Sequence, residues 1–322
     1  MYLTVLHILL SMPVVIFLVA VILWRSVLYP RQAQIPLADG LIVAAHPDDC
    51  VIAAGEYGIE CVRGGKQLRI VYMTCGATTA DSQHAKLRRT EAALAWSKAN
   101  LAPACLTFMD APESSPDEAP RQSAECLDRI ASKLREAVAR LSPGSVVVVP
   151  AAAERHVDHR TLRRIAIAAI AACGREDLLV YEAPEYSNYI SLVCNPFRAL
   201  RVLLGLLPVV WRIAGRVTLD APYAYCPTFG LGAVRFPADE SRLRLKGEML
   251  STFVSQGTLQ AAFGRPDVFR RVRVDKAARQ KEVPFGMRVG NFVYTSTTLL
   301  FVCSVILSIA ALVATVTVAF AH

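Results

Sequence analysis

The sequence predicts an α/β protein with a Rossmann-like, doubly wound and mostly parallel sheet, helices on both faces, and a transmembrane helix at each end. Between residues 41 and 182, short β-rich apolar runs alternate with helical segments, which indicates a parallel sheet. These runs are mostly apolar, as is typical of strands buried on both faces. Both ends of the 322-residue chain are long and uncharged, as membrane spans are.

The alternation can be followed along the chain. The first strand starts at Leu41 and runs into His46, and Gly64 and Gly65 end the helix that follows it. Further strands are expected at 68–74, 105–109, 145–150 and 178–182. Helices are expected at 50–63, 84–100, 123–141, 160–173 and 241–253. This order of elements predicts one α/β domain without an internal repeat.

The chain is expected to divide into an N-terminal anchor at 1–28, a central domain at 29–289 and a C-terminal transmembrane helix at 290–322. Residues 2–24 and 291–322 contain no Asp, Glu, Lys or Arg, and each stretch exceeds the roughly 20 residues that cross a bilayer. The first could instead be a cleaved signal peptide, but it lacks a basic start and its apolar run is long. The second could instead be a buried core helix.

Flanking charges predict the orientation of these spans. Arg25 and Arg31 follow the first span, and Arg279, Lys281 and Arg288 precede the second. Because positive residues remain on the cytoplasmic side, the central domain is expected in the cytoplasm with both termini outside. The sequence therefore predicts an integral membrane protein whose first partner is the lipid bilayer.

Two basic regions fit a lipid surface. Segment 197–216 brackets an apolar centre with arginines, so it either lies in the bilayer interface or is a core helix broken at Pro208. Residues 270–281 add six lysines and arginines to a chain of net charge +8, which an anionic membrane explains. Neither an aromatic-rich RNA motif nor zinc-finger spacing accompanies them, so nucleic acid is not an expected partner. The nine cysteines form no C-x-x-C pair and are expected to be reduced.

Two polar motifs follow predicted strands directly. HPDD at 46–49 ends the first strand, and HVDH at 156–159 follows the strand at 145–150. Because the carboxyl ends of parallel strands share one edge of the sheet, we expect the motifs to converge there. In the first motif, Asp could merely cap the next helix and His46 could be a hydrogen-bonded core residue. The pairing of both motifs favours a metal site.

Together the motifs offer His46, Asp49 and His159 as three protein ligands. Histidine and carboxylate suit zinc, and three ligands leave a position for water, as in catalytic zinc sites. Another divalent metal would also fit such ligands. Asp48 and His156 are left for proton transfer.

At this point the sequence resembles a known family. The features are LIVAAHPDD, a following GG, LRIVYMT, Arg88-x-x-Glu91 and the HVDH motif, and they look like those of the PIG-L/LmbE-like zinc deacetylases. That family removes acetyl groups from N-acetylglucosamine-type substrates. Lys246 with Ser255-Gln256 resembles a late family element, so the similarity covers roughly residues 41–256.

The resemblance implies a role for each motif residue. His46, Asp49 and His159 match the zinc ligands. Asp48 matches the general base that takes the proton of the attacking water. His156 matches the histidine that stabilises the oxyanion, in its protonated form, and helps to protonate the amine.

Three further residues carry less defined expectations. Arg88 resembles a substrate-contacting arginine, although a surface helix charge is an equal alternative. Asp158 is expected to orient His156 or to cap the helix rather than to react. Cys50 stands where the family usually has Glu, so it changes the surroundings of the metal ligands, and a fourth-ligand role is the weaker alternative.

The sequence therefore predicts a membrane-anchored, zinc-dependent N-deacetylase. Its expected substrate is an acetylated amino sugar of the N-acetylglucosamine type, lipid-linked because the enzyme is anchored. A soluble sugar conjugate is the alternative substrate. A non-catalytic membrane scaffold with a decayed site is the alternative from outside the enzymes, and Cys50 is its main support.

Overall fold

The computed structural model describes residues 31–115, 119–152, 154, 156–184, 234–237, 239–256 and 267–275. The two expected spans, 1–28 and 290–322, and the segment 197–216 lie outside these residues. Among the described helices, none has the length and apolar character needed to cross a bilayer. The expected limits of the central domain stay a prediction.

Eight strands of the described part form one sheet with the order β1-β7-β8-β6-β5-β2-β3-β4. Their bounds are β1 Arg31–Gln32, β2 Gly40–Ala44, β3 Leu68–Thr74, β4 Leu106–Ala111, β5 Val146–Pro150, β6 Leu179–Ala183, β7 Val234–Arg235 and β8 Val268–Arg271. The strands β4, β3, β2, β5 and β6 are mutually parallel, whereas β8 runs antiparallel to β6. The chain moves outward from β2 to β4 and then returns to β5 beside β2. This reversal is the switch point at which doubly wound sheets bind their ligands.

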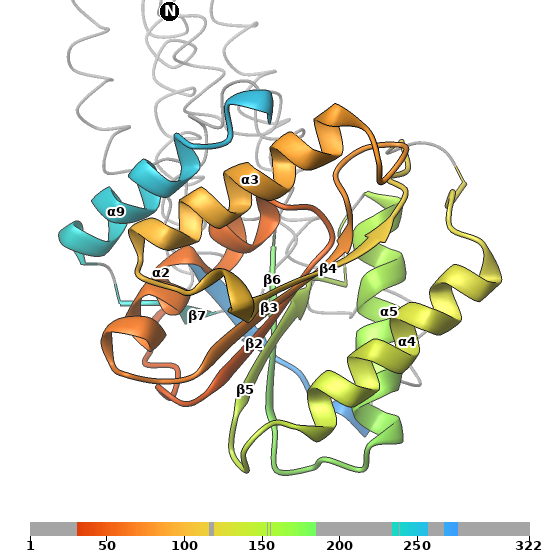
Figure 1. Cartoon of the computed structure of the whole chain (residues 1–322). Coiled ribbons are helices and arrows are strands. Elements are labelled where there is room, and N and C mark those ends of the chain that lie inside the picture. Colours follow the sequence, from red (N-terminus) through yellow and green to blue (C-terminus); the bar gives the residue numbers. More distant parts are fainter. Residues whose placement is uncertain are drawn as a thin grey trace, which may run out of the picture.

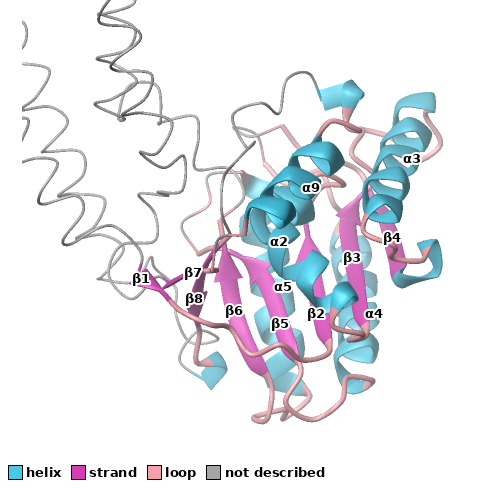
Figure 2. Cartoon of the chain, turned by 90° about the vertical axis from the view of Figure 1, so that its left-hand side faces the viewer, coloured by secondary structure: helices cyan, strands magenta, loops and turns pink. Residues whose placement is uncertain are grey.

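Helices cover both faces of the sheet (Figures 1 and 2). Their bounds are α2 Asp49–Arg63, α3 Gln83–Lys98, α4 Ala124–Ala139, α5 Val157–Ala172 and α9 Glu240–Leu250, with short 3-10 turns at Pro103–Cys105 and Val254–Gln256. The helices α2, α3 and α9 lie on one face, and α4 and α5 lie on the other. The described part is therefore a three-layer α/β structure.

Alternation along the buried strands separates two cores. Ile42 and Ala44 of β2 pack in the core shared with α2, α3 and α9. Leu41 and Val43, their neighbours, pack in the core shared with α4 and α5. Because successive side chains point to opposite faces, a strand covered on both sides must be apolar throughout. This is the physical reason for the continuous apolar run that ends at the polar motif.

The predicted central elements are confirmed, with small shifts at their ends. The three short strands β1, β7 and β8 were not expected from the sequence. The helix expected at 160–173 begins three residues earlier, at Val157. As a result, His159 lies in the first turn of α5 rather than in a loop, and the backbone of this turn fixes its direction.

Candidate active site

The site lies at the switch point, where the loops after β2 and β5 meet. The backbone N–H of His46 donates to Asp49 Oδ2 at 2.7 Å, which closes the turn between β2 and α2. Asp48 occupies the N-cap position of α2, but its side chain makes no capping hydrogen bond. His156 caps α5, because its Nδ1 accepts from the backbone N–H of Asp158 at 3.2 Å. The structure thus brings the two sequence motifs together, as expected.

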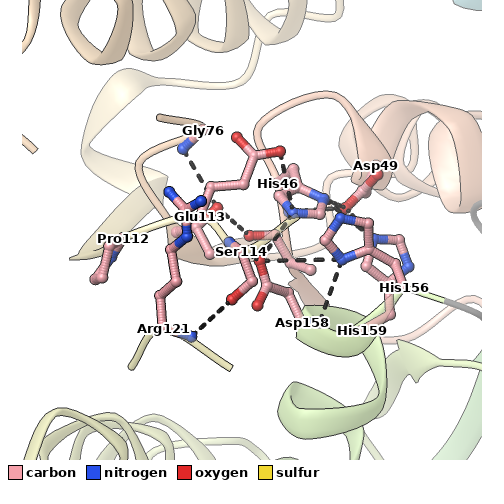
Figure 3. Close-up of polar contacts among 12 residues, drawn as sticks. His46, Asp49, Gly76, Pro112, Glu113, Ser114, Arg121, His156, Asp158 and His159 are labelled. Atoms are coloured by element: carbon pink, nitrogen blue, oxygen red, sulfur yellow. Dashed lines mark hydrogen bonds and ion pairs between the residues drawn. The ribbon is translucent and has the colours of Figure 1, made fainter. Parts of the chain in front are cut away.

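Three predicted ligands place one atom each in a small triangle (Figure 3). His46 Nδ1 lies 3.0 Å from Asp49 Oδ2, His159 Nε2 lies 3.1 Å from His46 Nδ1, and His159 Nε2 lies 3.2 Å from Asp49 Oδ2. Tetrahedral zinc with bonds of about 2.0–2.1 Å places its ligand atoms roughly 3.3–3.4 Å apart. All three residues are buried. The spacing therefore fits zinc with little adjustment.

The charges around this triangle also suit a cation. Burial opposes a charge on His46, yet the carboxylates of Asp49 and Asp158 outweigh it and raise the pKa of this imidazole to about 10. Burial favours neutral Asp49, but His159 and His46 hold the pKa of that carboxyl well below its usual range. Asp49 Oδ1 is buried and has no hydrogen-bond partner among the described residues. A divalent metal would supply both the positive charge and a partner for carboxylate oxygen.

His156 offers a second way to hold a metal. Nitrogen atoms of His46, His156 and His159 all lie within 4.8 Å of one another. The Nδ1 atom of His156 is engaged with the helix backbone, which leaves Nε2 for the site. The triangle with Asp49 is tighter and supplies the carboxylate that three histidines lack. The ligand set of His46, Asp49 and His159 stays a prediction, which this tighter spacing favours.

The protonation state of His156 differs from the expectation. Burial, followed by the neighbouring imidazoles of His46 and His159, lowers the pKa of His156 to about 4. The neutral imidazole therefore dominates at pH 7, whereas the sequence argument expected the protonated form. A neutral ring whose Nδ1 accepts a hydrogen bond carries its proton on Nε2 and can still donate from there. The catalytic role of His156 stays a prediction.

Asp158 orients His46 more directly than it orients His156. Its Oδ2 lies 3.3 Å from His46 Nε2 but 4.0 Å from His156 Nδ1. The same carboxylate accepts from the backbone N–H of Ser114 at 2.9 Å and from Gln122 Nε2 at 3.0 Å. In neutral His46 this contact keeps the proton on Nε2 and leaves Nδ1 for a metal. Such a carboxylate behind a ligand histidine is common in zinc sites.

The charge on Asp158 is strongly stabilised. Burial opposes ionisation, but hydrogen bonds from His46 and from the backbone of Ser114 lower the pKa of Asp158 to about 2. Asp158 is therefore ionised throughout the neutral range. This supports its expected place beside the ligands and not among the reacting groups.

Asp48 lies beside the triangle and is paired with Arg88. Arg88 Nη2 donates to Asp48 Oδ1 at 2.8 Å. Burial and then the neighbouring carboxylate of Asp49 raise the pKa of Asp48, while Arg88 acts in the opposite direction. Arg88 is itself buried, and its Nη1 donates to the carbonyl of Gly76 and to Glu113. The expected contact of Arg88 with substrate stays a prediction.

Cys50 faces the core and not the triangle. Its Sγ lies 3.0 Å from Tyr72 Oη and accepts from Trp96 Nε1 at 3.2 Å. Burial raises the pKa of the Cys50 thiol to about 12. The departure from the usual Glu thus changes a buried polar cluster behind α2, and these contacts give no support to a fourth ligand at this position.

Several site residues were not found from the sequence. Glu113, in the loop after β4, places Oε1 3.5 Å from His46 Nε2 and Oε2 3.1 Å from Arg88 Nη1. Ser114 and Gln122 bind Asp158, as described above. The sequence position of Glu113 and Ser114 could have indicated their role, because they follow a parallel strand that ends at the same edge of the sheet.

A polar cavity of about 480 Å³ opens beside the site. Glu113 and Ser114 form part of its wall, so the cavity reaches the groups that contact His46 and Asp158. The remaining lining residues are Gly76, Ala77, Thr78, Ser82, His84, Ser115 and Arg121. The wall combines hydroxyl groups and charged side chains with apolar surface, which suits a ligand with polar groups.

Comparison with known proteins agrees with this site. A family model described as PIG-L: GlcNAc-PI de-N-acetylase matches residues 41–170, which contain both motifs and the loop with Glu113. No curated protein sequence matches the chain.

Solved structures with similar folds include three deacetylases. A deacetylase of teicoplanin biosynthesis, in its bog complex, is 14% identical over 73% of this chain and 99% of its own, with a TM-score of 0.48. The zinc-inhibited form of teicoplanin deacetylase Orf2 is 14% identical over 73% and 99%, with a TM-score of 0.46. N,N'-diacetylchitobiose deacetylase from Pyrococcus horikoshii is 16% identical over 88% and 97%, with a TM-score of 0.44. At these TM-scores, the likeness carries no argument about substrate.

Proposed function

We propose that the chain is a zinc-dependent deacetylase that removes the acetyl group from a lipid-linked sugar of the N-acetylglucosamine type. The match of residues 41–170 to the PIG-L family model supports this proposal. The observation that carries this proposal is the triangle of His46 Nδ1, Asp49 Oδ2 and His159 Nε2, with Asp48 and His156 at its side. Three ligands and two adjacent proton-transfer groups are what metal-assisted amide hydrolysis requires.

The reaction adds water to the acetyl carbon and breaks the bond to nitrogen. Zinc held by the triangle would polarise the carbonyl and make the attacking water more acidic. Asp48 accepts a proton from this water. Its side chain makes no capping hydrogen bond to α2 that would compete for the carboxylate. His156 would donate from Nε2 to the developing negative charge on oxygen. The amine nitrogen receives a proton as it leaves, so the products are acetate and a free amine.

The cavity beside the site supports a sugar as the amine-bearing part. Serine and threonine hydroxyls in its wall can exchange hydrogen bonds with sugar hydroxyls. A volume of about 480 Å³ lies within the range of small-molecule sites.

The lipid linkage and the membrane location rest on the sequence. Uncharged stretches at 2–24 and 291–322 supply two anchors, and the basic segment 270–281 supplies charges for an anionic surface. Under this proposal the chain is an integral membrane protein with its catalytic domain on the cytoplasmic side. An enzyme held there meets a substrate whose lipid part stays in the bilayer.

Acetate release by the full-length chain in detergent tests the proposal. We expect release from an N-acetylglucosaminyl phospholipid or a polyprenyl-linked N-acetylglucosamine, and far less from the same sugar without lipid. Asp48→Asn is the matched control, because it preserves the shape of the side chain and removes the base. Equal turnover of both substrates would overturn the lipid linkage alone, whereas no acetate from any acetylated amino sugar would overturn the function.

A further inference from the structure

The guanidinium of Arg88 joins three loops at the edge of the sheet. Nη2 donates to Asp48 Oδ1 at 2.8 Å, in the loop after β2. Nη1 donates to the carbonyl of Gly76 at 3.0 Å, after β3, and to Glu113 Oε2 at 3.1 Å, after β4. The side chain of Arg88 is only 3% exposed. Its planar group is therefore held in one plane by partners from three separate segments.

Gly76 makes this position available to the arginine. Its φ of +71° belongs to the left-handed region, which side chains other than glycine rarely adopt. A Cβ at this position would lie 2.5 Å from Arg88 Cδ, 2.6 Å from Nε and 2.7 Å from Cζ. Only a glycine lets the backbone after β3 approach the guanidinium so closely. The loop is therefore shaped around Arg88 as well as around its own turn.

Asp48 and Glu113, the two acids that Arg88 contacts, differ in their surroundings. Asp48 is fully buried beside Asp49, and Arg88 offsets its charge more than His46 does. Glu113 is 27% exposed at the cavity wall and holds the other nitrogen of the same guanidinium. Nη1 and Nη2 belong to one rigid, planar guanidinium. By holding Nη1, Glu113 therefore restrains the direction in which Nη2 approaches Asp48.

We propose that Arg88 is a positioning residue for Asp48, and that Gly76 and Glu113 in turn position Arg88. Arg88 then acts on the base and not on the substrate, which differs from the role that its sequence motif implied. The proposal rests on the proposed function insofar as Asp48 is the base. Glu113 then affects kcat indirectly, because it holds Arg88 in position.

Steady-state kinetics separate positioning from substrate binding. A substrate contact raises KM, whereas loss of a correctly placed base lowers kcat. We expect Arg88→Ala to lower kcat on the order of 100-fold. We expect Glu113→Ala to lower it about 10-fold, because the carbonyl of Gly76 still holds Nη1. In both variants KM should stay within about twofold. Glu125→Ala, an exposed acid in the first turn of α4, is the control and should leave both constants unchanged.

Conservative variants keep the test valid if the alanine variants fold poorly. Glu113→Gln retains an acceptor oxygen for Nη1, so its kcat should lie between those of the wild type and Glu113→Ala. Gly76→Ala should lower kcat, because its Cβ would displace the guanidinium of Arg88. A rise in KM with unchanged kcat in the Glu113 variants would show that Glu113 binds substrate and would overturn the proposal.

A readout without turnover distinguishes this proposal from the proposed function. Asp48→Asn, Arg88→Ala and the double variant form a cycle in thermal unfolding, and we expect the melting temperature shifts to be non-additive. The same cycle in a Glu113→Ala background should be closer to additive. Additive shifts in the original cycle would refute the coupling even if the enzyme is active. A protein that releases no acetate but shows the coupling would refute only the assigned reaction.

Discussion

Replacement of Asp158 by Asn tests whether this carboxylate orients His46. Three donors converge on Asp158, from His46, from the backbone of Ser114 and from Gln122. The Asn oxygen can take the place of Oδ2, which serves His46 and Ser114. Its amide then faces Gln122 Nε2, which keeps its hydrogen bonds to the carbonyl of Pro112 and to Ser114 Oγ. The change therefore removes charge and largely preserves the packing.

The expected cost falls on metal affinity. Loss of a hydrogen-bonded group behind a ligand histidine typically lowers affinity 10- to 100-fold, or about 1.4–2.7 kcal/mol. Competition between the purified protein and a chelator at neutral pH measures this change for zinc. Asp128→Asn, an exposed carboxylate on α4, is the matched control. Zinc affinity within twofold of the wild type in Asp158→Asn would refute the orienting role, whatever the effect on turnover.

Three further predictions follow from the buried groups. His159→Ala should abolish tight zinc binding, whereas His156→Ala should keep it; the converse in metal analysis would favour the three-histidine arrangement. Cys50→Ala leaves Trp96 Nε1 without its sulfur acceptor and should lower the free energy of unfolding by about 1–3 kcal/mol in denaturant titrations. Loss of zinc from this variant would instead show that Cys50 is a metal ligand. Burial, followed by the carboxylate of Asp267, raises the pKa of Glu56 from 4.5 to about 7. Between these two values the folded state binds a proton that the unfolded state has lost. The free energy of unfolding should therefore fall by up to about 3 kcal/mol as the pH rises from 4.5 to 7. Glu56→Gln should flatten that profile in unfolding measured from pH 4.5 to 8, and parallel profiles would contradict the argument.

The central sheet could be predicted because its strands are covered on both faces. A strand buried on both faces is apolar at nearly every position, so a run such as 146–150 stands out in the sequence. The short strand β8 has no such signal, because its residues Arg270 and Arg271 are polar and its pairing with β6 is antiparallel. Its place is decided by a tertiary contact, since Arg270 Nη2 donates to Glu182 Oε2 at 2.6 Å. Local patterns contain no information about that contact.

The metal ligands could be predicted because parallel topology brings strand ends together. The partners of those ligands could not, because they depend on where loops fold back. Asp158 lies two residues from His156, yet the first turn of α5 aims its carboxylate at His46. Glu113 is separated from His46 by 67 positions and reaches it only because β4 lies at the same edge of the sheet. Sequence spacing within one motif is therefore a poor guide to which side chain supports which ligand.

The late part of the described chain supports the site through α3. Arg88 and Glu91 lie one turn apart on this helix, and Arg88 holds Asp48 while Glu91 accepts from the backbone N–H of Ser255 at 2.8 Å and from its hydroxyl at 2.5 Å. Residues one helical turn apart share a face, so both contacts fix the same side of α3. Loss of the Ser255 contact would remove a restraint on the middle of the helix that carries the partner of Asp48.

A second connection runs from the late segment to α2. Lys246 is buried and donates from Nζ to Asp267 Oδ1 at 2.6 Å and to the carbonyl of Ile52 at 2.9 Å. Ile52 lies two residues before Ala54, where a φ of −141° interrupts the helix that begins at Asp49. A buried lysine without its partner is costly, so this pair fixes α9 against the interrupted segment of α2. Residues beyond 170, outside the matched family model, thereby stabilise the helix that presents a metal ligand at its first turn.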